Sequence, residues 1–158
     1  MVKEIYKELE SITSYLNNYE KNKIRQALKL SEKVHSDQLR NSGDPFIMHP
    51  LEVAKILTSI KLDADSIVAG LLHDTLEDTN LSIEEINNNF GNQIVELVDG
   101  LTKINKYSLK VKNQKFGENY KKLILATTKD LRVILIKLAD RLHNMRTIQF
   151  IKNDNKKT

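Results

Sequence analysis

The stretch VILIKLA at residues 133–139 decides between an all-helical fold and a mixed one. It is apolar nearly all round, so by itself it fits a buried strand as well as a buried helix. The apolar pattern continues through Leu142 and Met145 at spacings of four and three residues, which are the spacings of a helix face. We therefore predict an all-α protein, with a buried helix here that places the carboxylate of Asp140 at the end of its apolar run.

Helical patterns also fill the chain before this stretch. Apolar residues at helical spacing predict helices over residues 3–16, 20–38 and 93–102, with a further helical pattern from residue 121. Three more helices are predicted from residues that favour helix starts: Pro50, then Asp63 or Asp65, and then Ser82 with Glu85 three residues later. The helix that starts near Asp63 or Asp65 should continue through Leu76. The helix that starts at Ser82 should end near Phe90.

The composition excludes several classes of protein. The chain has 158 residues and no cysteine, which rules out a disulfide scaffold, a cysteine zinc site and a thiol nucleophile. Five glycines and two prolines are too few for a turn-rich all-β fold. We expect one domain over residues 1–150 and a polar, disordered tail over 151–158. No apolar run reaches the length of a membrane span and no signal-peptide core is visible, so we expect a cytoplasmic protein.

Charge is segregated along the sequence. Residues 63–99 contain nine acids and no lysine or arginine, whereas residues 101–158 contain fifteen basic residues and four acids. An acidic stretch can hold a cation and a basic one can attract a polyanion, so the two together suit a metal-dependent site for a phosphorylated ligand. Two solvated helix faces of opposite sign would give the same pattern. The lysine-rich segment 103–122 is predicted to be a mobile loop or a frayed helix start.

The string LLHDTLEDT at residues 71–79 carries the most chemistry. On a continuous helix, His73 and Glu77 form one pair four residues apart, and Asp74 and Asp78 form a second. The adjacent histidine and aspartate can supply a nitrogen and an oxygen to one divalent ion, and the two later carboxylates could reach a water beside it. The alternative is that all four are ordinary polar residues of a helix surface.

Two more candidates lie far from this string in the sequence. Asp140 ends a buried segment, so its charge must be paired or bound to a cation, and an ion pair with Arg141 or Arg146 is the simpler explanation. His49 emerges from a Gly/Pro loop directly before a helix start, where a neutral capping histidine is the alternative. Combined with the histidine and aspartate at 73–74, these residues form an N₂O₂ donor set suited to Mn²⁺, Fe²⁺, Co²⁺ or Zn²⁺.

The order of these motifs resembles a known family. The strings HSDQLRNSGDPFIMHPLEVAKIL, AGLLHDTLEDT, FGNQIVELVDGLTKI and RVILIKLADRLHNMRT span about residues 34–147. Together they resemble the HD-type hydrolase domain of the bacterial RelA/SpoT alarmone enzymes and their small single-domain relatives. The resemblance implies an HD-domain helical bundle and hydrolysis of the 3′-pyrophosphate of (p)ppGpp to GDP or GTP plus pyrophosphate.

The resemblance also implies roles for individual residues. It assigns one metal ion, usually Mn²⁺, to His49, His73, Asp74 and Asp140. It assigns the attacking water and proton transfer to Glu77 and Asp78, and contacts with the guanosine nucleotide to Arg40, Ser42, Lys137 and Asn144. The expected partner is therefore a small nucleotide, with neither membrane nor nucleic acid involved, and a homo-oligomer remains open.

The chain departs from the family pattern at three places. Asn41 stands where the family usually has lysine, which removes a cation from the nucleotide side, and Asp37 stands where glycine is common. Family domains normally continue for several helices beyond the HNMRT-like string, whereas this chain ends eleven residues later. We therefore expect a bundle truncated at its C-terminal side, with exposed apolar stripes and no synthetase region.

Two other functions remain open and a third is disfavoured. The chain could be an HD phosphohydrolase of a different nucleotide, or a non-catalytic domain that binds alarmone or a partner. A nucleic-acid binder using residues 103–122 is disfavoured, because that segment contains few aromatic residues and no recognisable module.

Overall fold

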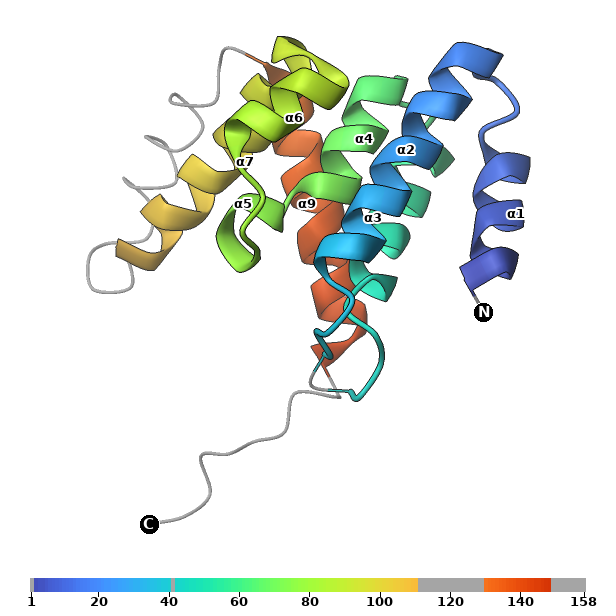
Figure 1. The fold of residues 1–158 in the computed structure, drawn as a ribbon. Helices are drawn as coiled ribbons and strands as arrows, with labels where there is room; N and C mark the ends of the chain where they lie inside the picture. The colour runs from blue at the N-terminus through green and yellow to red at the C-terminus, as the bar shows by residue number, and fades with distance from the viewer. Residues whose placement is uncertain (1, 41, 111–129, 149–158) are drawn as a thin grey trace.

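The chain folds into a bundle of helices. The computed structural model describes residues 2–40, 42–110 and 130–148 (Figure 1). Within those ranges an isolated bridge between Leu39 and Pro45 is the single β feature, so the predicted all-α class is confirmed. The helices are α1 (Val2–Ile12), α2 (Asn18–Val34), α3 (Met48–Ser59), α4 (Ala64–Leu72), α5 (Thr75–Asp78), α6 (Ile83–Phe90), α7 (Asn92–Lys110) and α9 (Leu131–Arg146).

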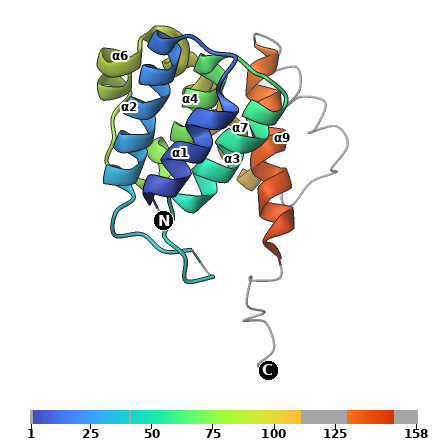
Figure 2. The ribbon, with the colours of Figure 1, turned by 90° about the vertical axis from the view of Figure 1, so that its right-hand side faces the viewer.

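Helix α4 is the centre of the bundle. It packs against α2, α3, α7 and α9, and every one of its residues except Asp65 is buried. A helix that is apolar on all sides requires neighbours on all sides, and its sequence ADSIVAGLL meets that condition. Figure 1 shows α4 between α2 and α7, and Figure 2 shows α9 directly beside α3. None of the described helices is long and apolar enough to cross a membrane.

Two of the three predicted start signals are formed as expected, at Asp63 and Ser82. The third is wrong, because α3 begins at Met48 and Pro50 is not its first residue. The Ser82 and Glu85 side chains make a reciprocal capping box at the start of α6, and Asn17 and Glu20 make a second one before α2. The Asp63 carboxylate accepts a hydrogen bond of 2.7 Å from the backbone N–H of Ser66 at the start of α4. Each cap satisfies donors that a helix start leaves without an intrahelical partner.

The prediction of one helix through Leu76 is wrong, because α4 ends at Leu72 and α5 begins at Thr75. The Thr75 hydroxyl donates a 2.7 Å hydrogen bond to the carbonyl oxygen of Leu72, and His73 Nδ1 lies 2.8 Å from the carbonyl oxygen of Gly70. Side chains, in place of backbone N–H groups, thus hydrogen-bond to two carbonyl oxygens at the end of α4. The junction, residues 73–74, turns away from the helix axis with both polar residues on it.

The prediction of a loop or frayed start from residue 103 is also wrong over residues 103–110, which extend α7. Thr102 and Ile104 remain buried, so the inward face of α7 continues past the predicted end at 102. The rest of that segment, the pattern starting at residue 121 and the tail 151–158 lie outside the described residues. The helix predicted at residues 133–145 is present as α9, but the prediction that it is buried is only partly correct, because Leu138, Leu142 and Met145 are exposed.

We expect Asp63→Ala to lower the free energy of unfolding by about 1–2 kcal/mol, as loss of a helix N-cap does. Asp63→Asn retains an acceptor for Ser66 and loses mainly the ion pair with Arg132 (3.0 Å). Because the Asp63 side chain is about half exposed, that pair should contribute less than about 1 kcal/mol. Urea unfolding of both variants measures the difference. Equal losses in the two would contradict the assignment of the effect to the cap.

Candidate metal centre and adjoining pocket

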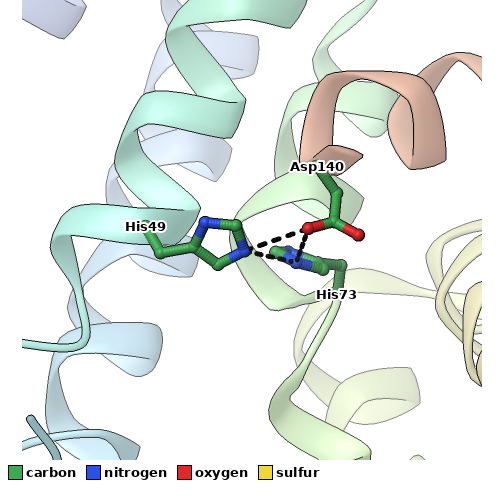
Figure 3. A group of neighbouring side chains, drawn as sticks. All are labelled: His49, His73 and Asp140. Atoms are coloured by element: carbon green, nitrogen blue, oxygen red, sulfur yellow. Dashed lines mark hydrogen bonds and ion pairs between the residues drawn. The ribbon is translucent and has the colours of Figure 1, made fainter. Parts of the chain in front are cut away.

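Three separate helical elements bring polar side chains to one buried point. His49 lies in the first turn of α3, His73 at the α4–α5 junction, and Asp140 on α9. The two Nε2 atoms of His49 and His73 are 3.2 Å apart, and Asp140 Oδ1 lies 3.2 Å from the first and 3.9 Å from the second. Figure 3 shows the three side chains pointing toward one another. Residues that are distant in the sequence therefore converge.

Asp74 completes the group. Its Oδ2 lies 3.0 Å from His73 Nε2 and 3.6 Å from His49 Nε2. The donor atoms of His49, His73 and Asp140 all lie within 4.8 Å of one another, a spacing that allows them to hold one metal ion. Two imidazole nitrogens and carboxylate oxygens suit a first-row divalent cation, so the residues present fit such an ion.

The Asp140 carboxylate is held by two residues of its own helix. Lys137 Nζ lies 2.6 Å from Oδ2, and the Asn144 amide donates a 2.6 Å hydrogen bond to Oδ1. The alternative partners from the sequence, Arg141 and Arg146, are not the ones that pair with it in the described structure. Although burial opposes ionisation, the hydrogen bond from His49 and the charges of His73 and Lys137 hold the pKa of Asp140 below its ordinary value. The group is therefore an anion at neutral pH.

A pocket of about 490 Å³ opens beside this cluster. The pocket is lined by all four residues that the resemblance assigns to the nucleotide, which are Arg40, Ser42, Lys137 and Asn144. The cluster residues His49, Asp74 and Asp140 line it as well. The Arg40 guanidinium donates a 3.2 Å hydrogen bond to the Asn144 side-chain oxygen, which links the loop after α2 to α9. The volume of the pocket lies within the range of small-molecule sites.

The two acids of α5 differ in their surroundings. Asp78 lines the pocket, whereas Glu77 lies outside its lining and accepts a 2.7 Å hydrogen bond from the side-chain amide of Asn105 on α7. Burial raises the pKa of both carboxyls, and the neighbouring charge of Asp74 raises both further. Of the two, Asp78 is the acid that lines the pocket.

Sequence reasoning missed His143. This buried residue lies on α9, and its Nδ1 is 2.7 Å from Nδ1 of His49, the ring nitrogen that faces away from the cluster. Burial, aided by His49, lowers the pKa of His143 to about 4. The available signal was its position three residues after Asp140, which places both on one face of a helix.

A second missed group ties the loop after α2 to α5. Gln38 Oε1 lies 2.8 Å from His35 Nδ1, and its amide donates a 2.7 Å hydrogen bond to the backbone carbonyl of Asp78. The His35 ring stacks on Phe46 with centroids 4.5 Å apart, and Phe46 in turn meets the His49 ring edge-on. These contacts are not visible in local patterns because they join three separate segments.

This fold and this cluster define the class of the protein. A helical core that brings histidine and aspartate side chains from separate helices to one buried point is the arrangement of an HD domain. The HD domain family matches residues 27–158, and the chain belongs to it.

Its relatives are (p)ppGpp enzymes of the RelA/SpoT kind, which confirms the resemblance seen in the motifs. The chain is 51% identical over 134 residues to a GTP pyrophosphokinase of Myxococcus xanthus, covering 83% of this chain and 18% of that protein. It is 42% identical over 146 residues to the bifunctional (p)ppGpp synthase/hydrolase SpoT of Escherichia coli K12, covering 92% of this chain and 21% of that one. The chain thus spans about a fifth of the length of these curated relatives.

Solved structures share the fold. One is described as a metazoan ortholog of SpoT that hydrolyzes ppGpp; it has a TM-score of 0.63 and 29% identity, over 80% of this chain and 70% of that one. Another, lmo0812 from Listeria monocytogenes, has a TM-score of 0.51 and 30% identity, over 71% of this chain and 68% of that one.

Proposed function

We propose that this protein hydrolyses the 3′-pyrophosphate of (p)ppGpp, giving GDP or GTP and pyrophosphate, in a metal-dependent reaction in the cytoplasm. The observation that carries the proposal is the convergence of His49, His73, Asp74 and Asp140 beside a pocket lined by both cations and acids. Relatives of this chain named guanosine-3′,5′-bis(diphosphate) 3′-pyrophosphohydrolase support the choice of substrate.

The four converging residues would hold the ion, and we propose Mn²⁺. When bound, such an ion lowers the pKa of water and offsets the negative charge of phosphoryl oxygens. Asp140 remains ionised in its own surroundings, held by Lys137 and Asn144. The chain therefore presents an anionic oxygen beside two imidazoles.

The substrate's phosphates and guanosine would occupy the adjoining pocket. Arg40, from the loop after α2, and Lys137, from α9, supply positive charge, and Ser42 and Asn144 supply hydrogen-bonding groups. Arginine can pair with phosphate in a two-pronged geometry or stack on a base, so Arg40 suits either end of the nucleotide. Asn144 contacts both Arg40 and Asp140, so it fixes the distance between the nucleotide side and the cluster.

The α5 acids would handle the protons. Water adds to the phosphorus attached to the 3′ oxygen, the bond from that phosphorus to the 3′ oxygen breaks, and the 3′ oxygen takes up a proton. Asp78, which lines the pocket, accepts the proton lost by the water. Glu77, which accepts a hydrogen bond from Asn105 on α7, assists Asp78 in this proton transfer.

The proposal is tested by incubating the purified chain with ppGpp and Mn²⁺ and separating products by ion-exchange chromatography. We expect GDP and pyrophosphate in equal amounts, and none from His73→Ala. A panel of other nucleotides tests for a different HD phosphohydrolase. Binding of ppGpp and Mn²⁺ with no turnover would contradict the proposal and favour the non-catalytic alternative.

The rate should depend on pH in a direction fixed by the α5 acids. A carboxyl must be ionised to accept a proton, and the pKa values of Asp78 and Glu77 are both raised. Activity should therefore fall as the pH drops through these raised values, above the pH at which ordinary carboxyls protonate. A profile of kcat against pH at saturating Mn²⁺ measures this, and a rate that stays level down to the usual carboxyl range would contradict it.

A further inference from the structure

The two imidazoles of the proposed metal centre differ in what holds their second ring nitrogen. His73 Nδ1 lies 2.8 Å from the carbonyl oxygen of Gly70, which can only accept a hydrogen bond. His49 Nδ1 lies 2.7 Å from Nδ1 of His143, a ring nitrogen that can donate or accept. The main chain thus fixes where His73 carries its hydrogen, whereas for His49 this depends on one side chain.

Only one hydrogen fits between the Nδ1 atoms of His49 and His143, so one ring donates and the other accepts. A His49 that binds an ion through Nε2 needs its lone pair there, and a neutral imidazole then carries its hydrogen on Nδ1. That hydrogen must be donated to a His143 whose own hydrogen is on Nε2. We propose that His143 is a positioning residue that holds His49 in the tautomer able to bind the ion.

The surroundings of His143 suit this role. It is 8% exposed and its ring centroid lies 4.9 Å from that of His49, so the contact is packed as well as hydrogen-bonded. It lies on α9 with Asp140, so one helix supplies both a ligand and the group that orients a ligand of α3. On another side the His49 ring meets Phe46 edge-on. The inference rests on the proposed metal centre and adds to it a residue that does not itself face the ion.

The test compares two variants by their affinity for Mn²⁺. His143→Leu fills similar space but cannot accept a hydrogen bond, whereas His143→Asn places an amide oxygen where Nδ1 was. Calorimetry on the metal-stripped chain should show that His143→Leu binds Mn²⁺ about 10–100-fold more weakly. Metal affinity falls by about this much when a ligand loses the residue that hydrogen-bonds to it. His143→Asn should restore most of the affinity. Met145→Ala, an exposed position on the same helix, is the matched control and should bind as wild type.

Nitrogen NMR of the zinc-loaded wild-type chain gives an answer that needs no variant. We expect His49 to carry its hydrogen on Nδ1 and His143 to carry its own on Nε2. A His143 with its hydrogen on Nδ1, a folded His143→Leu with undiminished affinity, or a His143→Asn as weak as His143→Leu would each overturn the inference and leave the proposed function intact. A wild-type chain that binds neither ion would overturn both.

Discussion

Replacing Asp140 with asparagine should abolish metal-dependent hydrolysis of ppGpp and weaken Mn²⁺ binding by more than about 100-fold. This is a larger loss than is usual when a residue that only hydrogen-bonds to a metal ligand is removed. Asparagine has nearly the same shape, so the change removes the charge and leaves the packing of α9 in place. The anionic oxygen 3.2 Å from His49 Nε2 is lost, and with it one of the two carboxylates of the cluster. Calorimetry with Mn²⁺ and the ppGpp assay measure the two effects together.

The substitution also leaves the Lys137 ammonium, 2.6 Å from the carboxylate in the wild type, without its counter-charge. A partly buried cation without a partner costs stability, so thermal unfolding of the metal-free variant must accompany the assay. Glu84→Gln removes an exposed acid on α6 and serves as the charge control. Near-normal Mn²⁺ affinity in a folded Asp140→Asn chain would exclude Asp140 from the metal centre.

The second large effect is expected at Asp78. Asp78→Asn should lower kcat by about 10²- to 10⁴-fold, the usual contribution of a positioned proton acceptor. Because Asp78 lies on α5 and lines the pocket, whereas the cluster is formed by α3, the α4–α5 junction and α9, its loss should leave Mn²⁺ affinity close to that of the wild type. The comparison of kcat with Mn²⁺ affinity therefore separates proton transfer from metal binding.

Glu77→Gln, measured in parallel, distinguishes the two acids. Since Glu77 lies outside the pocket lining and is held by Asn105, its neutralisation should reduce kcat less than that of Asp78. If Asp78→Asn retains most of its kcat while Glu77→Gln loses it, the order of the two roles is reversed. If both retain it, proton transfer does not depend on α5.

Much of the fold was accessible from the sequence because its signals are local. Capping boxes and apolar periodicity involve residues three or four apart, and Ser82 with Glu85 forms in the structure as expected. The end of α4 was missed because two side chains, those of His73 and Thr75, take up carbonyls that a continuing helix would use. The length of α7 was missed because its lysine content outweighed Ile104, whose burial is set by neighbouring helices.

The candidate site was accessible in a different way. Taken singly, His49, His73 and Asp140 each had an ordinary structural explanation. Their combined donor types suggested a metal site, and the order of motifs along the chain then assigned one ion to them through the family resemblance. Their convergence is a property of how α3, α4 and α9 pack, which no short window records. For the same reason the ring of His143 and the amide of Gln38 were missed, since each contacts a residue at least forty positions away.

The amide of Gln38 has a consequence for how the protein could evolve. It joins the loop that carries Arg40 to the backbone of Asp78. Its oxygen is hydrogen-bonded to His35, whose ring stacks on Phe46. With the roles proposed for Arg40 and Asp78, a displacement of this loop would also displace the acid proposed to accept the proton. Substitutions in this loop that change ligand preference are then expected to change turnover as well.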